Sequence, residues 1–346
     1  MKRFLAAALL IAAPVAFAQK KAASLKVYFV DVEGGQATLF VPPTGENMLV
    51  DTGWPSASRA DHNSANHILE ICKLAGVTKI DNLVITHYHT DHVGGVPDLA
   101  AKIPIGRFID HGVNREDNDI PTVAGWQAYQ KVLANGHSAH LTVKPGDVLP
   151  IKGMHVEVVS ADGNVLDKPL VGFGAGAANP ACAKSIVKAP ENTENDRSVG
   201  MMIMFGKLRI LDMGDLTWAK ERPLMCPVNK LGKVDVYVVS HHGFDRSSSP
   251  ALLDAIGARV AIMDNGAVKG GETAAWDIID HAPGLKDLWQ LHSAIHNDAA
   301  HNTSEARIAN LPGPDSSHYL VLTGHSNASF AVTNSRTNQT VQYAAP

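Results

Sequence analysis

The segment His87-Tyr88-His89-Thr90-Asp91-His92 directly follows the apolar run Leu83-Val84-Ile85-Thr86. Because alternate side chains of an extended segment point the same way, His87 and His89 can bind one metal ion. Asp91 and His92, where the chain turns into a helix, would face a second metal position about 3.5–4 Å away, the usual spacing of a two-metal site. Imidazole and carboxylate ligands favour zinc, with manganese and iron as alternatives.

Around this segment the chain alternates between predicted strands and helices. The predicted strands cover residues 25–32, 36–41, 47–51, 80–86, 105–110, 198–205, 207–211, 234–240, 259–263, 319–323 and 328–334. The predicted helices cover residues 65–75, 97–103, 123–134, 250–256 and 273–281. This alternation predicts an α/β (α+β) fold in which helices cover sheets.

The mature chain is predicted to be one domain, residues 19–346, because no linker separates its two similar β/α halves, about 24–145 and 146–346. Residues 161–198 are rich in Gly, Ala, Asn and Pro and are expected to form a long loop insertion. A loop of this length is more often functional than idle.

Residues 1–18 have the pattern of a secretory signal peptide. Lys2 and Arg3 precede a short apolar run, and Ala16-Phe17-Ala18 forms a small-x-small cleavage site before Gln19. The alternative is an uncleaved membrane anchor. Cleavage after Ala18 predicts an exported protein, periplasmic or secreted. No apolar run of about 20 residues follows, so we expect no membrane span after cleavage.

Composition narrows the class of partner. The chain has 346 residues, of which 45% are hydrophobic and 18% are charged, which excludes a disordered or fibrous protein. Loss of Lys2 and Arg3 lowers the basic side chains from 30 to 28 against 34 acidic ones, a net charge of −6. This charge argues against long duplex nucleic acid. The expected partner is a small-molecule or cell-envelope substrate. The oligomeric state does not follow from the sequence.

The three cysteines predict one disulfide and one free thiol. They are Cys72, Cys182 and Cys226, and no Cys-x-x-Cys pair occurs, which excludes a zinc ribbon. Cys72 lies in an apolar helical pattern and is expected to be a buried thiol. Cys182 and Cys226 lie in loop-like, proline-containing contexts, and export makes a bridge between them plausible.

These motifs resemble those of the metallo-β-lactamase superfamily, whose hallmark is the His-x-His-x-Asp-His segment. Met48-Leu49-Val50-Asp51-Thr52-Gly53 resembles its first motif, in which the aspartate orients the metal-binding loop. Ile210-Leu211-Asp212-Met213-Gly214-Asp215 resembles the strand whose last aspartate bridges both metals. Val238-Val239-Ser240-His241-His242-Gly243 resembles the motif that delivers a histidine to the second metal. The resemblance implies a four-layer αββα sandwich with a dinuclear site between its halves.

Within the superfamily, three segments resemble the ComEC-type domain. They are Phe29-Val30-Asp31-Val32-Glu33-Gly34-Gly35-Gln36-Ala37, Glu194-Asn195-Asp196-Arg197-Ser198, and His241-His242-Gly243 with the later Ser247-Ser248-Ser249. That branch is associated with DNA-uptake nucleases and with phosphorylcholine esterases of the cell wall.

The resemblance implies a ligand set for two divalent ions, namely His87, His89, Asp91, His92, Asp215 and His241. Asp51 would orient a ligating histidine. Asp91 or His242 would pass a proton to the leaving group or contact the substrate. The family's third histidine for the first metal is missing. Two replacements stay open: an oxygen ligand from Glu194, Asn195 or Asp196, or His111 at the end of strand 105–110.

The function implied is metal-dependent hydrolysis, in which two metals lower the pKa of a bridging water to about 7. The ComEC-like motifs favour a phosphodiester or related phosphoryl substrate. The alternatives are a carboxylic ester, lactone or β-lactam hydrolase, and a non-catalytic metal- or ligand-binding protein. The glycine-rich segment 265–271 either offers Lys269 to an anion or is a plain surface loop. The spacing of His292 and His296, four residues apart, would allow them to share a helix face, but nothing completes a site around them, and they are interpreted as substrate-loop or surface residues.

Overall fold

The computed structural model describes residues 23–57, 63–136, 138–314 and 317–346. The predicted signal peptide, residues 1–18, lies outside the described residues. Within the described ranges, no helix combines the length and the apolar character needed to cross a membrane.

The first sheet has nine strands in the order β17-β16-β15-β1-β2-β3-β4-β5-β6. Their bounds are β1 (Leu25–Phe29), β2 (Thr38–Val41), β3 (Met48–Val50), β4 (Ile80–Val84), β5 (Ile105–Asp110), β6 (Ala139–Thr142), β15 (Leu320–Gly324), β16 (Phe330–Asn334) and β17 (Thr340–Tyr343). Strands β3 to β6 are parallel, so their carboxyl ends lie at one edge of the sheet.

The second sheet has eight strands in the order β14-β13-β12-β11-β10-β9-β7-β8. Their bounds are β7 (His155–Ala161), β8 (Asn164–Val165), β9 (Gly200–Phe205), β10 (Leu208–Asp212), β11 (Val236–Val238), β12 (Val260–Met263), β13 (Asp287–His292) and β14 (Ile308–Asn310). Strands β10 to β14 are parallel. Both sheets therefore present a row of carboxyl ends from which loops can carry a site.

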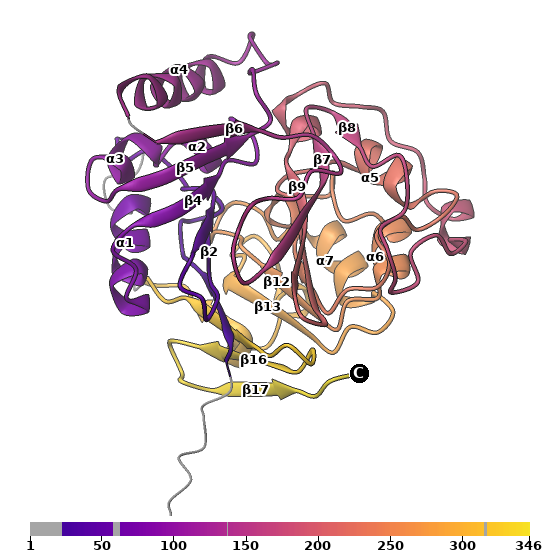
Figure 1. Ribbon diagram of the computed structural model, residues 1–346. Coiled ribbons are helices and arrows are strands. Elements are labelled where there is room, and N and C mark those ends of the chain that lie inside the picture. Colours follow the sequence, from indigo (N-terminus) through magenta and orange to yellow (C-terminus); the bar gives the residue numbers. More distant parts are fainter. Residues whose placement is uncertain (1–22, 58–62, 137, 315–316) are drawn as a thin grey trace, which may run out of the picture.

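The two sheets pack face to face with helices outside (Figure 1). Helices α1 (Ser64–Ala75), α2 (Thr90–Val93), α3 (Val96–Ala100) and α4 (Ile120–Asn135) lie on the first half, and α5 (Trp218–Met225), α6 (Pro250–Ile256) and α7 (Thr273–Asp280) lie on the second. One apolar core lies between the sheets, and each sheet has a further core against its helices. This confirms the predicted four-layer αββα sandwich.

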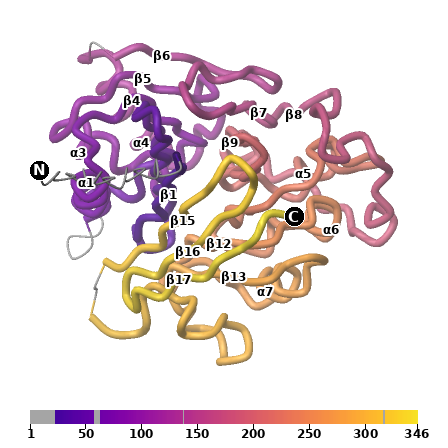
Figure 2. Tube along the Cα trace, turned by 60° about the horizontal axis from the view of Figure 1, so that its bottom comes forward, coloured from indigo at the N-terminus to yellow at the C-terminus, as the bar shows by residue number. Residues whose placement is uncertain are grey.

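The carboxyl-terminal strands are arranged differently from the expectation. The hairpin predicted over residues 319–334 forms, but it joins the first sheet, where Leu25 of β1 pairs antiparallel with Gly324 of β15. Figure 2 shows β15 to β17 in yellow alongside indigo β1. The segment predicted as the second half, residues 146–346, therefore contributes strands to both sheets.

The positions of His292 and of the three cysteines can be compared with the sequence analysis. His292 ends strand β13, so it shares no helix face with His296, although their spacing would allow one. The apolar run Leu288 to Leu291 is buried, which favours a central strand. Cys182 and Cys226 form the predicted disulfide, and Cys72 is a free, buried thiol.

Candidate metal centre

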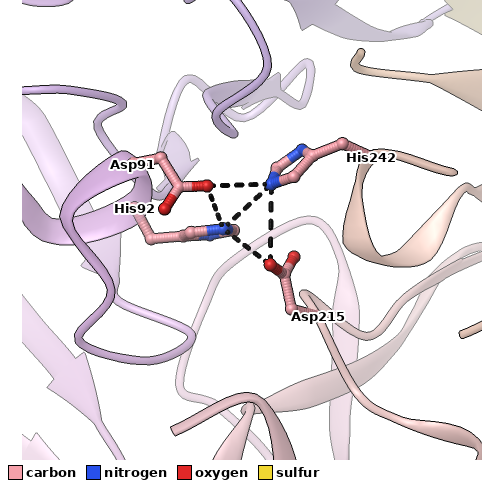
Figure 3. A group of neighbouring side chains, drawn as sticks. All are labelled: Asp91, His92, Asp215 and His242. Atoms are coloured by element: carbon pink, nitrogen blue, oxygen red, sulfur yellow. Dashed lines mark hydrogen bonds and ion pairs between the residues drawn. The ribbon is translucent and has the colours of Figure 1, made fainter. Parts of the chain in front are cut away.

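Four buried side chains from opposite sheets meet where the loops after β4, β10 and β11 converge (Figure 3). They are Asp91, His92, Asp215 and His242, and we call them the four-residue cluster. Each offers one ligand atom, and these atoms lie within 4.8 Å of one another. Asp91 and His92 come from α2, whereas Asp215 and His242 come from the second half. Two carboxylates and two imidazoles at this spacing are a donor set suited to divalent cations.

The contacts inside the cluster are close. His242 Nε2 lies 3.1 Å from Asp91 Oδ2 and 3.1 Å from His92 Nε2. His92 Nε2 lies 3.2 Å from Asp91 Oδ2 and 3.2 Å from Asp215 Oδ2. Burial alone would favour neutral imidazoles, but the surrounding carboxylates outweigh it and raise the pKa of His92 well above its usual range. They raise the pKa of His242 to about 10, against burial and Lys269.

Asp51 holds one imidazole of the cluster in place. His92 Nδ1 donates to Asp51 Oδ2 at 2.7 Å, which turns His92 Nε2 toward the cluster. Thr86 fixes the same carboxylate, with its hydroxyl donating to Oδ2 at 2.6 Å and its backbone N–H donating to Oδ1 at 2.8 Å. This is the orienting contact that the resemblance assigns to Asp51.

Asp264 plays the matching part for the second imidazole, with Oδ1 3.3 Å from His242 Nδ1. The sequence analysis did not identify Asp264. A signal was available, because Asp264 directly follows the buried apolar strand β12, as Asp215 follows β10 by a short turn. Both histidines of the cluster thus have a carboxylate behind them.

The turn after β11 carries unusual backbone geometry. His241 and His242 have φ angles of 56° and 52°, in the left-handed region, and Gly243 follows with φ 83°. Left-handed non-glycine residues each cost about 1–3 kcal/mol and cluster at functional sites. Two bonds hold the turn: His241 N donates to Gly214 O at 3.1 Å, and Gly271 N donates to His242 O at 2.8 Å.

This turn decides which histidine enters the cluster. The sequence analysis gave His241 to the second metal and His242 to proton transfer or the substrate. The structure brings His242 into the cluster and places His241 Nε2 3.6 Å from Asp215 Oδ2. Burial lowers the pKa of His241 to about 4, so its imidazole is neutral at pH 7. The division of roles between the two histidines stays a prediction.

His87 and Asp215 have unpartnered atoms at the place predicted for the first metal. His87 Nε2 is buried, lies 3.8 Å from Asp215 Oδ2, and has no hydrogen-bond partner among the described residues. Asp215 Oδ1 is likewise buried without a partner in that part of the chain. Unsatisfied buried polar atoms are costly and call for a cause, and a bound cation would satisfy both. The residues present therefore fit a metal ion here.

His89, the second histidine predicted for this metal, points elsewhere. Its Nε2 contacts Glu116 Oε2 at 3.0 Å, although its ring centroid lies 4.7 Å from that of His87. Glu116 also accepts a hydrogen bond from Glu194 N at 2.8 Å. The sequence analysis missed Glu116, which lies in the loop between β5 and α4 with no motif to mark it.

The candidates for the missing third ligand lie beside the metal-binding segment. His111 Nε2 donates to Glu194 Oε2 at 2.9 Å, and Glu194 also accepts from Tyr88 N at 3.3 Å and Arg115 N at 2.7 Å. The His111 ring lies 4.5 Å from that of Tyr88. Asp196 accepts hydrogen bonds from Thr217 and from two backbone N–H groups.

Two atoms among these candidates are still available as metal ligands. Asn195 Oδ1 and His111 Nδ1 are buried and have no hydrogen-bond partner within the described ranges. Both carboxylate oxygens of Glu194 and both of Asp196 already accept hydrogen bonds inside the protein. The identity of the third ligand therefore stays a prediction, with Glu194 serving as a hydrogen-bond acceptor for three neighbours.

Comparisons with known proteins find a family model and several relatives with similar sequences. The metallo-beta-lactamase superfamily model matches residues 30–174. The chain is 25% identical over 285 residues to Recombination protein 2 of Haemophilus influenzae, covering 82% of this chain and 29% of that protein. It is 23% identical over 256 residues to ComE operon protein 3 of Bacillus subtilis, covering 70% and 28%.

A third relative matches a shorter region. Hydroxyacylglutathione hydrolase of Rhodopseudomonas palustris is 29% identical over 89 residues, covering 26% of this chain and 28% of that protein. The chain thus spans less than a third of the length of each of these three relatives.

Proposed function

We propose that this chain, whose residues 30–174 match the metallo-beta-lactamase superfamily model and whose motifs resemble the ComEC-type branch, is an exported metallo-hydrolase of phosphodiesters or related phosphoryl substrates. The observation that carries the proposal is the four-residue cluster. Its members come from loops of both sheets and are buried together, which no structural requirement of either sheet explains. A buried pair of carboxylates is costly unless protons or cations neutralise it.

The residues of this chain would divide between two cations. Asp215 is suited to bridge them. Its Oδ2 lies 3.2 Å from His92 Nε2, and its Oδ1 is buried without a hydrogen-bond partner among the described residues. His92, His242 and Asp91 would hold one cation, and His87 would contribute to the other with His89 after release from Glu116. We propose zinc, with manganese and iron as the alternatives.

When bound, such ions supply Lewis-acid stabilisation and lower the pKa of water near them. The protein itself would keep the ligand side chains in a fixed orientation. Asp51 and Asp264 fix the two cluster imidazoles through their Nδ1 atoms. His241 is a neutral imidazole at the border of the cluster, and in this role it would hydrogen-bond the substrate. Asp91, which is ionised at rest, would take up the proton lost by the attacking water and pass it to the leaving group.

The substrate proposal rests on the ComEC-type motifs and relatives. The net charge of −6 for residues 19–346 disfavours long duplex nucleic acid as the partner. A small phosphodiester or a phosphodiester of the cell envelope is consistent with export, which we propose from the pattern of residues 1–18. The oligomeric state is a separate question that a sizing experiment answers.

An activity panel on metal-analysed protein tests the proposal. The panel compares bis(p-nitrophenyl) phosphate, p-nitrophenyl phosphate, p-nitrophenyl acetate, a lactone and a chromogenic cephalosporin. We expect metal-dependent turnover of the diester, which is abolished by chelator and by Asp215→Asn. Asp254→Asn, an exposed acid on α6, is the matched control and should behave like the parent protein.

The other outcomes are equally informative. Faster turnover of the acetate ester, lactone or cephalosporin than of the diester would reject the phosphoryl substrate. No turnover of any compound by protein loaded with two ions would favour the non-catalytic metal-binding alternative.

A further inference from the structure

Lys269 lies on a loop that is fixed to the histidine turn. The loop, residues 264–271, follows β12, and Gly271 N donates to His242 O at 2.8 Å. Gly270 has φ +78°, and a Cβ atom there would stand 2.2 Å from His242 O. Only glycine allows this approach. The position of the Lys269 backbone relative to the four-residue cluster is therefore set by the packing of the loop.

The Lys269 ammonium group contacts the cluster at Asp91. Nζ forms an ion pair with Asp91 Oδ2 and donates to Gly34 O at 2.7 Å. The Lys269 side chain is 23% exposed, whereas that of Asp91 is 9% exposed. The ammonium thus lies between the buried cluster and the solvent.

Two aromatic rings flank the same ammonium group. Nζ lies 5.2 Å from the centroid of the Trp54 ring and 5.9 Å from that of Phe244. Trp54 Nε1 donates to Glu33 O at 3.2 Å, which fixes its ring, and the Phe244 ring lies 4.9 Å from that of His241. The ammonium group beside Asp91 therefore lies near two aromatic rings.

The present contact of Lys269 uses an oxygen that a metal ion would also need. Asp91 Oδ2 is the atom that faces His92 and His242 inside the cluster. A cation held there neutralises Asp91 and repels the nearby ammonium group. The flexible four-carbon chain lets the ammonium move outward while the backbone stays. After this movement the Lys269 ammonium group would lie near the cluster without the Asp91 carboxylate that now balances its charge.

We propose that Lys269 is a substrate-binding residue that selects anionic substrates by pairing with a non-bridging oxygen of a phosphodiester, while Trp54 and Phe244 receive its organic groups. The proposal rests on the proposed function and names a determinant of its substrate class. An ammonium at this place favours a phosphodiester monoanion over a neutral ester or lactone, because only the former brings a charge to pair with it.

Binding of inorganic phosphate to zinc-loaded protein tests the proposal without turnover. Calorimetry should show phosphate affinity at least about tenfold weaker for Lys269→Met than for the parent, as expected for loss of a charge-assisted hydrogen bond. Lys269→Arg should restore most of it. Lys207→Met, an exposed lysine of the β9–β10 turn, should equal the parent. Zinc content must be equal in all four proteins.

The second measurement is the ratio of kcat/KM for bis(p-nitrophenyl) phosphate to that for p-nitrophenyl acetate. Lys269→Met should lower this ratio at least about tenfold, and Lys207→Met should not lower it. Equal phosphate affinity in Lys269→Met and the parent overturns the proposal, as does loss of zinc in Lys269→Met. If phosphate binds through Lys269 but no ester is hydrolysed, the proposed function fails and this inference stands.

Discussion

His242 Nε2 lies 3.1 Å from Asp91 Oδ2, although the two residues are 151 positions apart and follow strands of different sheets. Asp91 follows β4 of the first sheet, and His242 follows β11 of the second. The contact therefore exists only when the two halves have packed against each other. Metal binding at this contact should stabilise the interface between the halves, because a ligand that binds only the folded state stabilises it.

Asp215 should be the residue whose loss removes most metal. Asp215→Ala should reduce the content toward zero ions per chain, whereas a single histidine variant should keep about one of two ions. The physical reason is that Asp215 Oδ2 lies 3.2 Å from His92 Nε2, while Oδ1 is buried without a hydrogen-bond partner among the described residues and is free to bind a second ion. Elemental analysis after reconstitution measures this. Asp254→Ala is the control, and retention of two ions by Asp215→Ala would contradict the bridging role.

His241 and His242 should have separable effects, and the geometry favours the opposite assignment from the one the sequence suggested. His242→Ala should lose one ion together with activity, because His242 belongs to the four-residue cluster. His241→Ala should keep both ions and lose turnover by about 10²–10⁴, the range for a group that assists proton transfer or contacts the substrate. Metal analysis combined with kcat distinguishes the two. The reverse pattern would restore the assignment made from the sequence.

His111→Ala should keep the metal content and lower the stability. The His111 ring packs on Tyr88, whose ring also lies 4.3 Å from that of Trp126 on α4, and His111 Nε2 is engaged by Glu194. Loss of the His111 hydrogen bond leaves buried Glu194 with one partner fewer, at a cost of about 1–3 kcal/mol.

Urea unfolding and metal titration of the same samples check this prediction. Glu194→Gln is the companion variant, because it removes the charge and keeps the shape. Weakened metal binding in His111→Ala alone would identify His111 as the third ligand.

The sequence was sufficient for much of the fold and for part of the site. The run before His87 is a buried strand as predicted, and Asp51, Asp91, His92 and Asp215 meet as their motifs implied. The motifs predict this meeting because each lies at the end of a strand, and the strand places the residues that follow it at one edge of its sheet.

Other features depend on contacts that no local pattern contains. The partner of β15 is β1, nearly 300 positions away, and pairing of this kind is set by the whole fold. Which of His241 and His242 enters the cluster depends on φ angles near +55°, which bonds from Gly214 and Gly271 maintain. Glu116 contacts His89 from a loop whose course the sequence does not reveal.

Cleavage of the Cys182–Cys226 disulfide should destabilise the protein without removing metal. The bridge joins residues 44 positions apart and closes a segment that includes the last part of the predicted loop insertion, residues 182–198. Loss of such a constraint costs about 2–4 kcal/mol in the chain-entropy account. Cys182→Ser with Cys226→Ser should lower Tm by several degrees, and Cys72→Ser serves as the cysteine control. An unchanged Tm in the double variant would show that packing alone holds this loop.

Metal binding should release protons and become tighter as the pH rises. In the metal-free protein burial opposes charge on His242, but the facing carboxylates raise its pKa to about 10, so its imidazole is protonated at pH 7. A metal ion binds only the neutral imidazole and must displace that proton. The pKa values of Asp91 and Asp215 are lowered, because neighbouring cationic groups outweigh burial, so these ligands are already ionised.

The raised pKa of His242 also makes the stability of the metal-free protein depend on pH. A histidine whose pKa is raised in the folded state contributes stability below its unfolded value, about 6.5, and loses it as the pH rises toward the folded value. We therefore expect the Tm of metal-free protein to fall between pH 7 and about 10, and that of zinc-loaded protein to fall less. Calorimetric titration of zinc at pH 7 in two buffers with different ionisation enthalpies measures the proton release directly. A binding enthalpy that is the same in both buffers would show that the cluster histidines are already neutral before the metal arrives.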